Sequence, residues 1–227
     1  GVSLTLDDLA LEAKGTAADI KDLALKAAGS ATANIKNGEF IASKLNISLT
    51  GTSGKDALDI KIDMPRLSLT ADRASGDKVT VVAKIAGAEG TTRATLALPG
   101  IEGTAEAFRS AAASLELDMK RGDLVITAKL ASPITGNVKA QQLSLPQLRA
   151  IISASGPNLP GKSITGELTG NAAVDGVKRN AQASLAGKVA DSSIKAQASI
   201  TDFTPFTLPF NIDVDQLDVD RYLPPKA

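Results

Sequence analysis

The sequence predicts an all-β protein built on one long, curved and mainly antiparallel sheet, a meander that forms a groove or half-pipe. Apolar and polar residues alternate over most of the 227 residues, which is the pattern of strands with one dry and one wet face. Short turns rich in Gly, Asp and Asn separate these runs, as in hairpins. No linker divides the chain, so we expect a single β-domain over residues 1–227.

The alternation indicates about twelve strands. In residues 41–50, for example, Ile47 and Leu49 take one face while Asn46 and Ser48 take the other. The predicted strands, in order, lie within residues 41–50, 58–63, 67–69, 79–85, 96–98, 115–119, 124–130, 164–168, 177–189, 194–200 and 208–214.

Two further segments fit a strand or a short helix. Residues 104–113 are rich in Ala, a strong helix former, and residues 145–153 carry apolar residues at helical spacing. We favour strand for both, because Leu148, Ala150 and Ile152 also alternate.

A short motif recurs four times: an apolar residue, any residue, Leu or Met, and then Pro. Because Pro cannot donate a hydrogen bond to a ladder, each copy is expected to bend a strand or lie at an edge. The four prolines are Pro65, Pro99, Pro146 and Pro209.

The composition argues against most enzyme and nucleic-acid functions. Lys and Arg number 25, as do Asp and Glu, so the chain has no basic excess with which to bind nucleic acid. It contains no His and no Cys, which removes the usual general base, the usual zinc ligands and thiolate nucleophiles. We therefore expect a non-enzymatic protein with no catalytic residues, no metal and no cofactor.

Residues Gly156 to Ser163 match the phosphate-binding P-loop pattern letter for letter. That site needs backbone N–H donors and a following helix, whereas Pro157 and Pro160 lack the donor and the next residues alternate like a strand. We therefore expect a turn between strands and no nucleotide.

A second candidate site is the acidic segment with Asp213, Asp215, Asp218 and Asp220. On a strand, Leu217 and Val219 would share the face of Asp213 and Asp215, so the phase changes near Gln216 and predicts a kink. The segment also lacks the Gly and Glu of a calcium loop. A solvated strand with a kink is the favoured interpretation over a cation site.

The continuous apolar face needs a partner. A β-sandwich, in which a second sheet seals it, is one solution. The other is a smooth groove for acyl chains, because burial of each CH₂ group contributes about 0.8 kcal/mol without specific contacts. The residues predicted to line such a groove are Val79, Val81, Leu96, Leu115, Leu117, Ile126, Leu185 and Ile194.

The C-terminal half resembles the AsmA family. The resemblance lies in PNLPGKSITGELTGNAAVDG, AQASLAGKVADSSIKAQASI and NIDVDQLDVDRYLPPK, and above all in the ending Asp220, Arg221, Tyr222 and Leu223. It extends over roughly residues 130 to 225.

This resemblance implies a fragment of a longer periplasmic protein, anchored in the inner membrane by a segment outside the sequence and related to chorein-type lipid-transfer proteins. It also implies phospholipid transport between membranes and a part in outer-membrane assembly, with phospholipid acyl chains and envelope proteins as partners. The alternative is a structural or protein-interaction β-module that binds no lipid.

Overall fold

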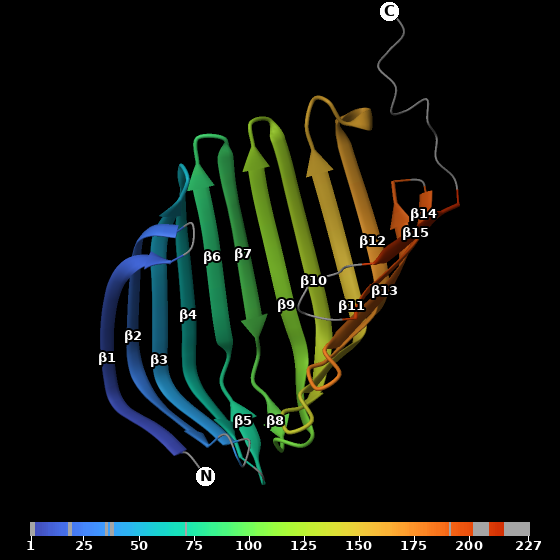
Figure 1. Cartoon of the computed structure of the whole chain (residues 1–227). Coiled ribbons are helices and arrows are strands. Elements are labelled where there is room, and N and C mark those ends of the chain that lie inside the picture. Colours follow the sequence, from blue (N-terminus) through green and yellow to red (C-terminus); the bar gives the residue numbers. More distant parts are fainter. Residues whose placement is uncertain are drawn as a thin grey trace, which may run out of the picture.

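The computed structural model describes residues 3–17, 20–34, 36, 39–70, 72–190, 192–201 and 209–215, which form one 15-stranded sheet (Figure 1). Neighbouring strands pair antiparallel, so the predicted all-β antiparallel meander is confirmed. In chain order the elements are β1 (Ser3–Ala17), β2 (Ile20–Asn34), β3 (Glu39–Ser53), β4 (Asp56–Leu69), β5 (Ala74–Gly76), β6 (Val79–Gly87), β7 (Gly90–Leu98), β8 (Glu102–Gly103), β9 (Phe108–Arg121), β10 (Leu124–Asn137), β11 (Gln142–Ser155), η1 (Pro160–Lys162, a 3-10 helix), β12 (Ser163–Asp175), β13 (Asn180–Val189), β14 (Ser192–Ile200) and β15 (Phe210–Val214).

Four short strands fill the space between β4 and β9. The β6–β7 hairpin joins β4 to β9 at one level of the sheet, and β5 with β8 joins the same two strands at the other. β5 and β6 thus act as one interrupted strand, and so do β7 and β8. At either level the sheet is one continuous surface that runs from β1 to β15 (Figure 1). No second sheet that would close a sandwich occurs among the described strands.

The structure adds strands that the sequence pattern did not predict. β1 and β2 are each 15 residues long. In β1 the apolar alternation changes phase near Asp8, and in β2 many of the apolar positions are Ala, so the contrast between the two faces is weak. The segment 145–153 lies inside β11, which confirms the strand interpretation. In the Ala-rich segment the strand begins only at Phe108, and residues 104–107 form a turn before it.

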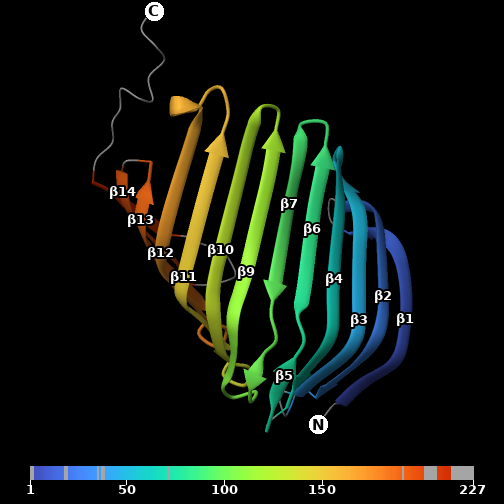
Figure 2. The ribbon, with the colours of Figure 1, turned by 180° about the vertical axis from the view of Figure 1, so that it is seen from behind.

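The long strands bend where their pairing is irregular. The register shifts between Leu6 and Leu9 in β1, and Asp8 and Lys44 have positive φ angles of 50°. Further shifts occur in β10 and β11, between Ala131 and Thr135 and between Leu145 and Leu148. Bulges of this kind bend a strand and increase its twist. The bend is clearest in β1 to β4 (Figure 1), and Figure 2 shows the sheet from its convex side.

Prolines lie along this bend, as their inability to donate to a ladder predicts. At Pro65, β4 exchanges β6 for β5 as its neighbour. Pro99 lies in the break between β7 and β8, and Pro146 lies in the register shift of β11. Pro209 immediately precedes β15, the last strand of the sheet. The prediction that these prolines mark bends or edges is confirmed.

The few buried side chains lie near the bend. Most are small, so the backbones come close together there, and the sheet has no thick core of its own. They are Ala42, Leu45, Ala74, Val79, Ile101, Ala105, Ser110, Ala113, Ser132, Leu148, Ala150 and Leu168.

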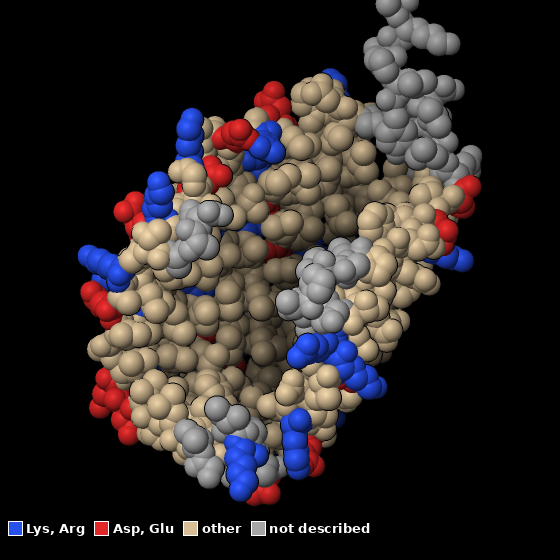
Figure 3. Space-filling model, viewed as in Figure 1, with Lys and Arg blue, Asp and Glu red and all other residues tan. Residues whose placement is uncertain are grey.

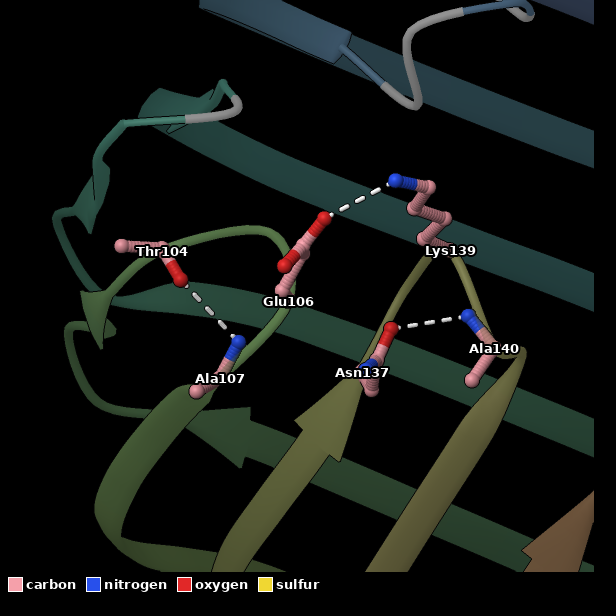
Figure 4. A network of polar contacts seen from close by, with 6 residues as sticks. All are labelled: Thr104, Glu106, Ala107, Asn137, Lys139 and Ala140. Carbon is pink, nitrogen blue, oxygen red and sulfur yellow. Dashed lines mark hydrogen bonds and ion pairs between the residues drawn. The ribbon is translucent and has the colours of Figure 1, made fainter.

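Polar caps hold the turns at the end of the sheet that contains β5 and β8. Thr104 Oγ1 accepts the N–H of Ala107 at 3.1 Å, and Asn137 Oδ1 accepts the N–H of Ala140 at 2.8 Å (Figure 4). An ion pair of 3.0 Å between Lys139 Nζ and Glu106 Oε1 joins the two turns. Residues in these turns are not part of the β-ladder, so the side-chain contacts hold the turns in place.

Asp175 caps the next turn and makes stability depend on pH. Its carboxylate accepts the backbone N–H of Lys178 at 2.9 Å and the Gln142 amide at 3.0 Å. These two hydrogen bonds, with Lys178 nearby, lower the pKa of Asp175. A lowered folded-state pKa stabilises the protein above the unfolded carboxyl pKa of about 3.9, and this stabilisation is lost as the pH falls through the folded value.

We expect Asp175→Asn to lower the melting temperature at pH 7 more than at pH 3, because pH 3 lies below the unfolded carboxyl pKa of about 3.9 and part of the stabilisation by the ionised carboxylate is lost there. Thermal melting of both proteins at the two pH values measures this difference. A deficit that is the same at pH 3 and pH 7 would exclude a role for the charge.

Candidate functional site

The candidate site is the concave, apolar face of the sheet. Residues directly opposite one another in antiparallel strands share a face, so the register defines rows that cross the whole sheet. One such row, the central row, carries no polar or charged side chain. Its members are Leu11, Ala27, Ile47, Ile62, Val81, Leu96, Leu115, Leu130, Ala150, Leu168, Gly187, Ile194 and Val214.

The row two residues away on the same face is apolar as well, up to its last member, Ser192 of β14. It contains Ala13, Leu25, Leu49, Ile60, Ala83, Ala94, Leu117, Ala128, Ile152, Gly166 and Val189. With about 4.8 Å between neighbouring strands, the central row extends for roughly 60 Å.

The row between these two faces the other way and is largely charged or polar. We call it the outer row, and its members are Glu12, Lys26, Ser48, Lys61, Val82, Thr95, Glu116, Lys129, Ile151, Glu167, Lys188 and Ser193.

Ion pairs between strands hold the charges of this convex face. Lys26 pairs with Glu12 at 3.0 Å, and Lys129 pairs with Glu116 at 3.3 Å. Such exposed pairs each stabilise a protein by at most about 1 kcal/mol. Their main consequence is that the convex face is well solvated, whereas the central row offers water no polar side chain.

The concave face is open to solvent. Figure 3 looks into the hollow, which is lined mainly by uncharged residues while Lys, Arg, Asp and Glu gather around its margin. Leu96, near the middle of the central row, is 42% exposed, and Leu11 and Val214 at the two ends are similarly exposed. Large exposed apolar patches on a protein typically mark a surface that binds something apolar.

The eight residues predicted to line a groove all lie on this face. Val81, Leu96, Leu115 and Ile194 belong to the central row, and Leu117 belongs to the row beside it. Ile126 lies in the next row beyond that of Leu117, and Leu185 lies in the row on the opposite side of the central row. Val79 is on the same face but is buried, so it supports the wall and offers little surface to a ligand.

Most of the central row was not predicted. Leu11 lies in a strand whose phase shift hid it, and Leu130 and Leu168 were recognised only as members of separate strands. The alternation in each strand shows which residues share a face. Which residues of different strands lie opposite one another depends on the turns and bulges, so the row emerges only from the register.

The P-loop-like segment is a turn between β11 and β12. Three of its backbone donors are used within the turn: Gly156 N–H donates to the Lys162 carbonyl at 3.0 Å, Leu159 N–H to the Gly156 carbonyl at 3.2 Å, and Lys162 N–H to the Leu159 carbonyl at 2.9 Å. β12 starts at Ser163, where a P-loop would continue into a helix. The prediction of a turn followed by a strand is confirmed, and the absence of nucleotide binding stays a prediction.

We expect Lys162→Ala to leave the melting temperature within about 2 °C of the wild-type value, since an exposed substitution here removes no backbone hydrogen bond. Calorimetry with magnesium and ATP is expected to show no binding to either protein. Magnesium-dependent ATP binding to the wild type that disappears in the variant would establish a phosphate site.

The acidic segment is described only in part. Asp213 lies in β15, and Asp215 accepts the backbone N–H of Ser193 at 2.7 Å. The expected kink near Gln216, Asp218 and Asp220 lie outside the described residues. Within the part of the chain that the structure describes, no group of three or more acidic side chains is placed to hold a metal ion.

In the described ranges, no helix has both the length and the apolar character required to cross a membrane. Comparison with known proteins gives no match to a family model, to a curated protein or to a solved structure. The resemblance to the AsmA family therefore remains a prediction from the sequence.

Proposed function

We propose that this chain is a non-enzymatic β-groove domain that holds phospholipid acyl chains and passes them along its concave face. The observation that carries the proposal is the central row, which crosses the sheet from β1 to β15 without a polar side chain. A catalytic site is not required for this function, and we propose none.

The energetic basis is the cost of leaving this face in water. Burial of apolar surface is favourable by roughly 25 cal/mol per Å². Leu96 and its neighbours in the row are only partly covered by protein, so a flexible apolar ligand that covers them gains this free energy without specific hydrogen bonds. Acyl chains meet these requirements, because they are apolar and adapt to an uneven wall.

The length of the face suits several chains in line. A bilayer has a hydrocarbon core of about 30 Å for two leaflets, so one acyl chain spans about half of that. The central row, at roughly 60 Å, is several times longer. A lipid that moves along it meets apolar residues at each strand, well exposed at Leu11, Leu96 and Val214 and nearly covered at Ala150 and Leu168. The row offers no polar group for tight binding at one point.

We further propose that the domain is the periplasmic part of an AsmA-like protein. In this proposal a segment outside the sequence anchors it to the inner membrane, and the domain contributes to outer-membrane assembly by transporting phospholipid between membranes. The support for this setting is the sequence resemblance of the C-terminal half.

A protein-interaction module is the second candidate. β1, 15 residues long, has β2 as its single partner among the described strands. The free hydrogen-bonding groups of such an edge can accept a further strand from another protein. In that case a partner protein, and not lipid, would cover the concave face.

Native mass spectrometry after incubation with phospholipid vesicles distinguishes the two candidates. We expect the purified chain to carry one or more phospholipid molecules that survive removal of the vesicles. A folded protein that carries no lipid over a range of vesicle compositions would contradict the lipid proposal and favour the interaction module.

A further inference from the structure

A charged notch lies at the end of the concave face opposite β5 and β8. It is a small cavity of about 140 Å³ between the start of β4, the β6–β7 turn and the end of β9. Its charged side chains are those of Asp56, Glu89 and Arg121, and Lys120 contributes to its wall. We call this cavity the notch.

The notch and the apolar rows belong to the same side of the sheet. Asp56 is two residues beyond Leu58 in β4, and Arg121 is two residues beyond Met119 in β9, so both point to the apolar side. Leu58, Ile85, Thr92 and Met119 form the nearest row, about 7 Å away along the strands. Ile85 in that row is 46% exposed. Charged and exposed apolar groups are therefore close neighbours here.

Two glycines keep the notch open. A Cβ atom on Gly87 would collide with the Asp56 carboxylate, and one on Gly90 would collide with the backbone carbonyl of Lys120. Gly90 also has a φ angle of +155°, which side chains rarely allow. Any other residue at these positions would fill the cavity or displace its wall.

The charges in the notch are of both signs. The Arg121 guanidinium pairs with the Glu89 carboxylate. The pKa of Arg121 is raised, first by its hydrogen bond and charge attraction to Glu89 and then by Asp56. Glu89 holds the ion pair with Arg121, and Asp56 lines the same cavity. Because the pair is exposed, it can open for a ligand at little cost.

These groups match the headgroup of an amino-phospholipid. A guanidinium binds a phosphate through two parallel hydrogen bonds. The notch contains two carboxylates and one guanidinium, and the second carboxylate attracts an ammonium group. Ile85 lies where the first methylene groups of an acyl chain would follow.

We propose that the notch binds the headgroup of a zwitterionic phospholipid with a primary ammonium group, with the phosphate on Arg121 and the ammonium on Asp56 and Glu89. This inference rests on the proposed lipid-binding function and adds a headgroup preference to it.

The test is competitive loading from vesicles that contain equal amounts of phosphatidylethanolamine and phosphatidylglycerol, read by native mass spectrometry. We expect the wild type to prefer phosphatidylethanolamine by about threefold to tenfold, as one or two exposed charge contacts provide. The double variant Asp56→Asn/Glu89→Gln is expected to lose this preference while it still loads both lipids.

A matched control changes the same amount of charge on the convex face. Glu116→Gln/Glu167→Gln removes two carboxylates that pair with Lys129 and Arg149, and the preference is expected to stay at the wild-type value. Arg121→Lys keeps the charge but loses the two-pronged phosphate contact, so loading of both lipids is expected to fall together. If the double variant does not fold, unchanged loading of both lipids by Arg121→Lys would exclude the phosphate contact at the notch and overturn the inference.

Three outcomes would overturn the inference. Equal loading of the two lipids by the wild type would exclude the headgroup site while leaving the lipid groove intact. An unchanged preference in the double variant would place the selectivity elsewhere. A wild type that loads neither lipid would overturn the proposed function and this inference with it.

Discussion

Gly170→Ala is expected to destabilise the protein by about 1–3 kcal/mol, the usual range of substitutions that overpack a tight site. Gly170 lies in β12 between Leu148 of β11 and Leu185 of β13. An added Cβ would collide with the carbonyl oxygen of Ser184 and lie 3.0 Å from the Leu185 Cα. Since hydrogen bonds hold β12 on both sides, neither neighbour can move away without loss of pairing. Urea denaturation of wild type and variant measures the difference.

Gly15→Ala is the matched control. Gly15 also lies in a strand, but a Cβ there would meet nothing within 4 Å. We expect this variant to be as stable as the wild type or slightly more so, because Ala restricts the unfolded chain. Equal losses in the two variants would mean that the cost comes from glycine replacement in general and not from the close approach of β12 and β13.

Much of the fold follows from simple alternation, as β3 and β10 illustrate. In β10, Leu124, Ile126, Ala128 and Leu130 take one face over seven residues, so the pattern determines the strand and its apolar side. In β1 the same rule fails at Asp8, where a positive φ angle shifts the phase and breaks the apparent pattern. Bulges arise from the pairing of strands, and no residue type predicts them reliably.

The sequence predicts the apolar side of each strand, but it does not predict how these residues align across strands in the central row. Leu96 and Leu115 were both expected to line the groove, yet nothing in either strand places them opposite each other. The charged notch was not predicted at all. Asp56 and Glu89 stand beside turns, where charged residues are usually solvated, and only the register brings them near Arg121.

Leu96→Asp is expected to reduce phospholipid loading at least about tenfold, because an ionised carboxylate in contact with acyl chains costs several kcal/mol. Leu96 is 42% exposed, so without lipid the carboxylate reaches water and the fold should lose no more than about 2 kcal/mol. The measurements are lipid loading by native mass spectrometry and urea denaturation of the lipid-free protein.

Ile151→Asp is the control for this variant. Ile151 is 43% exposed, as Leu96 is, but it lies in the outer row beside Lys129. The same chemical change on the convex face should leave loading unaffected. If both variants lost loading equally, the effect would come from general destabilisation. If Leu96→Asp alone unfolded the chain, the concave face would be a sealed core.

The most direct test of the groove is to locate bound lipid by photocrosslinking. Benzoylphenylalanine is placed in turn at Leu11, Leu96 and Val214 on the central row and at Ile151 on the outer row, and each protein is irradiated with phospholipid vesicles. The groove predicts lipid adducts at the three positions of the central row and few or none at Ile151. Adducts at Ile151 as frequent as those at Leu96, or none at Leu96 in a protein that carries lipid, would contradict it.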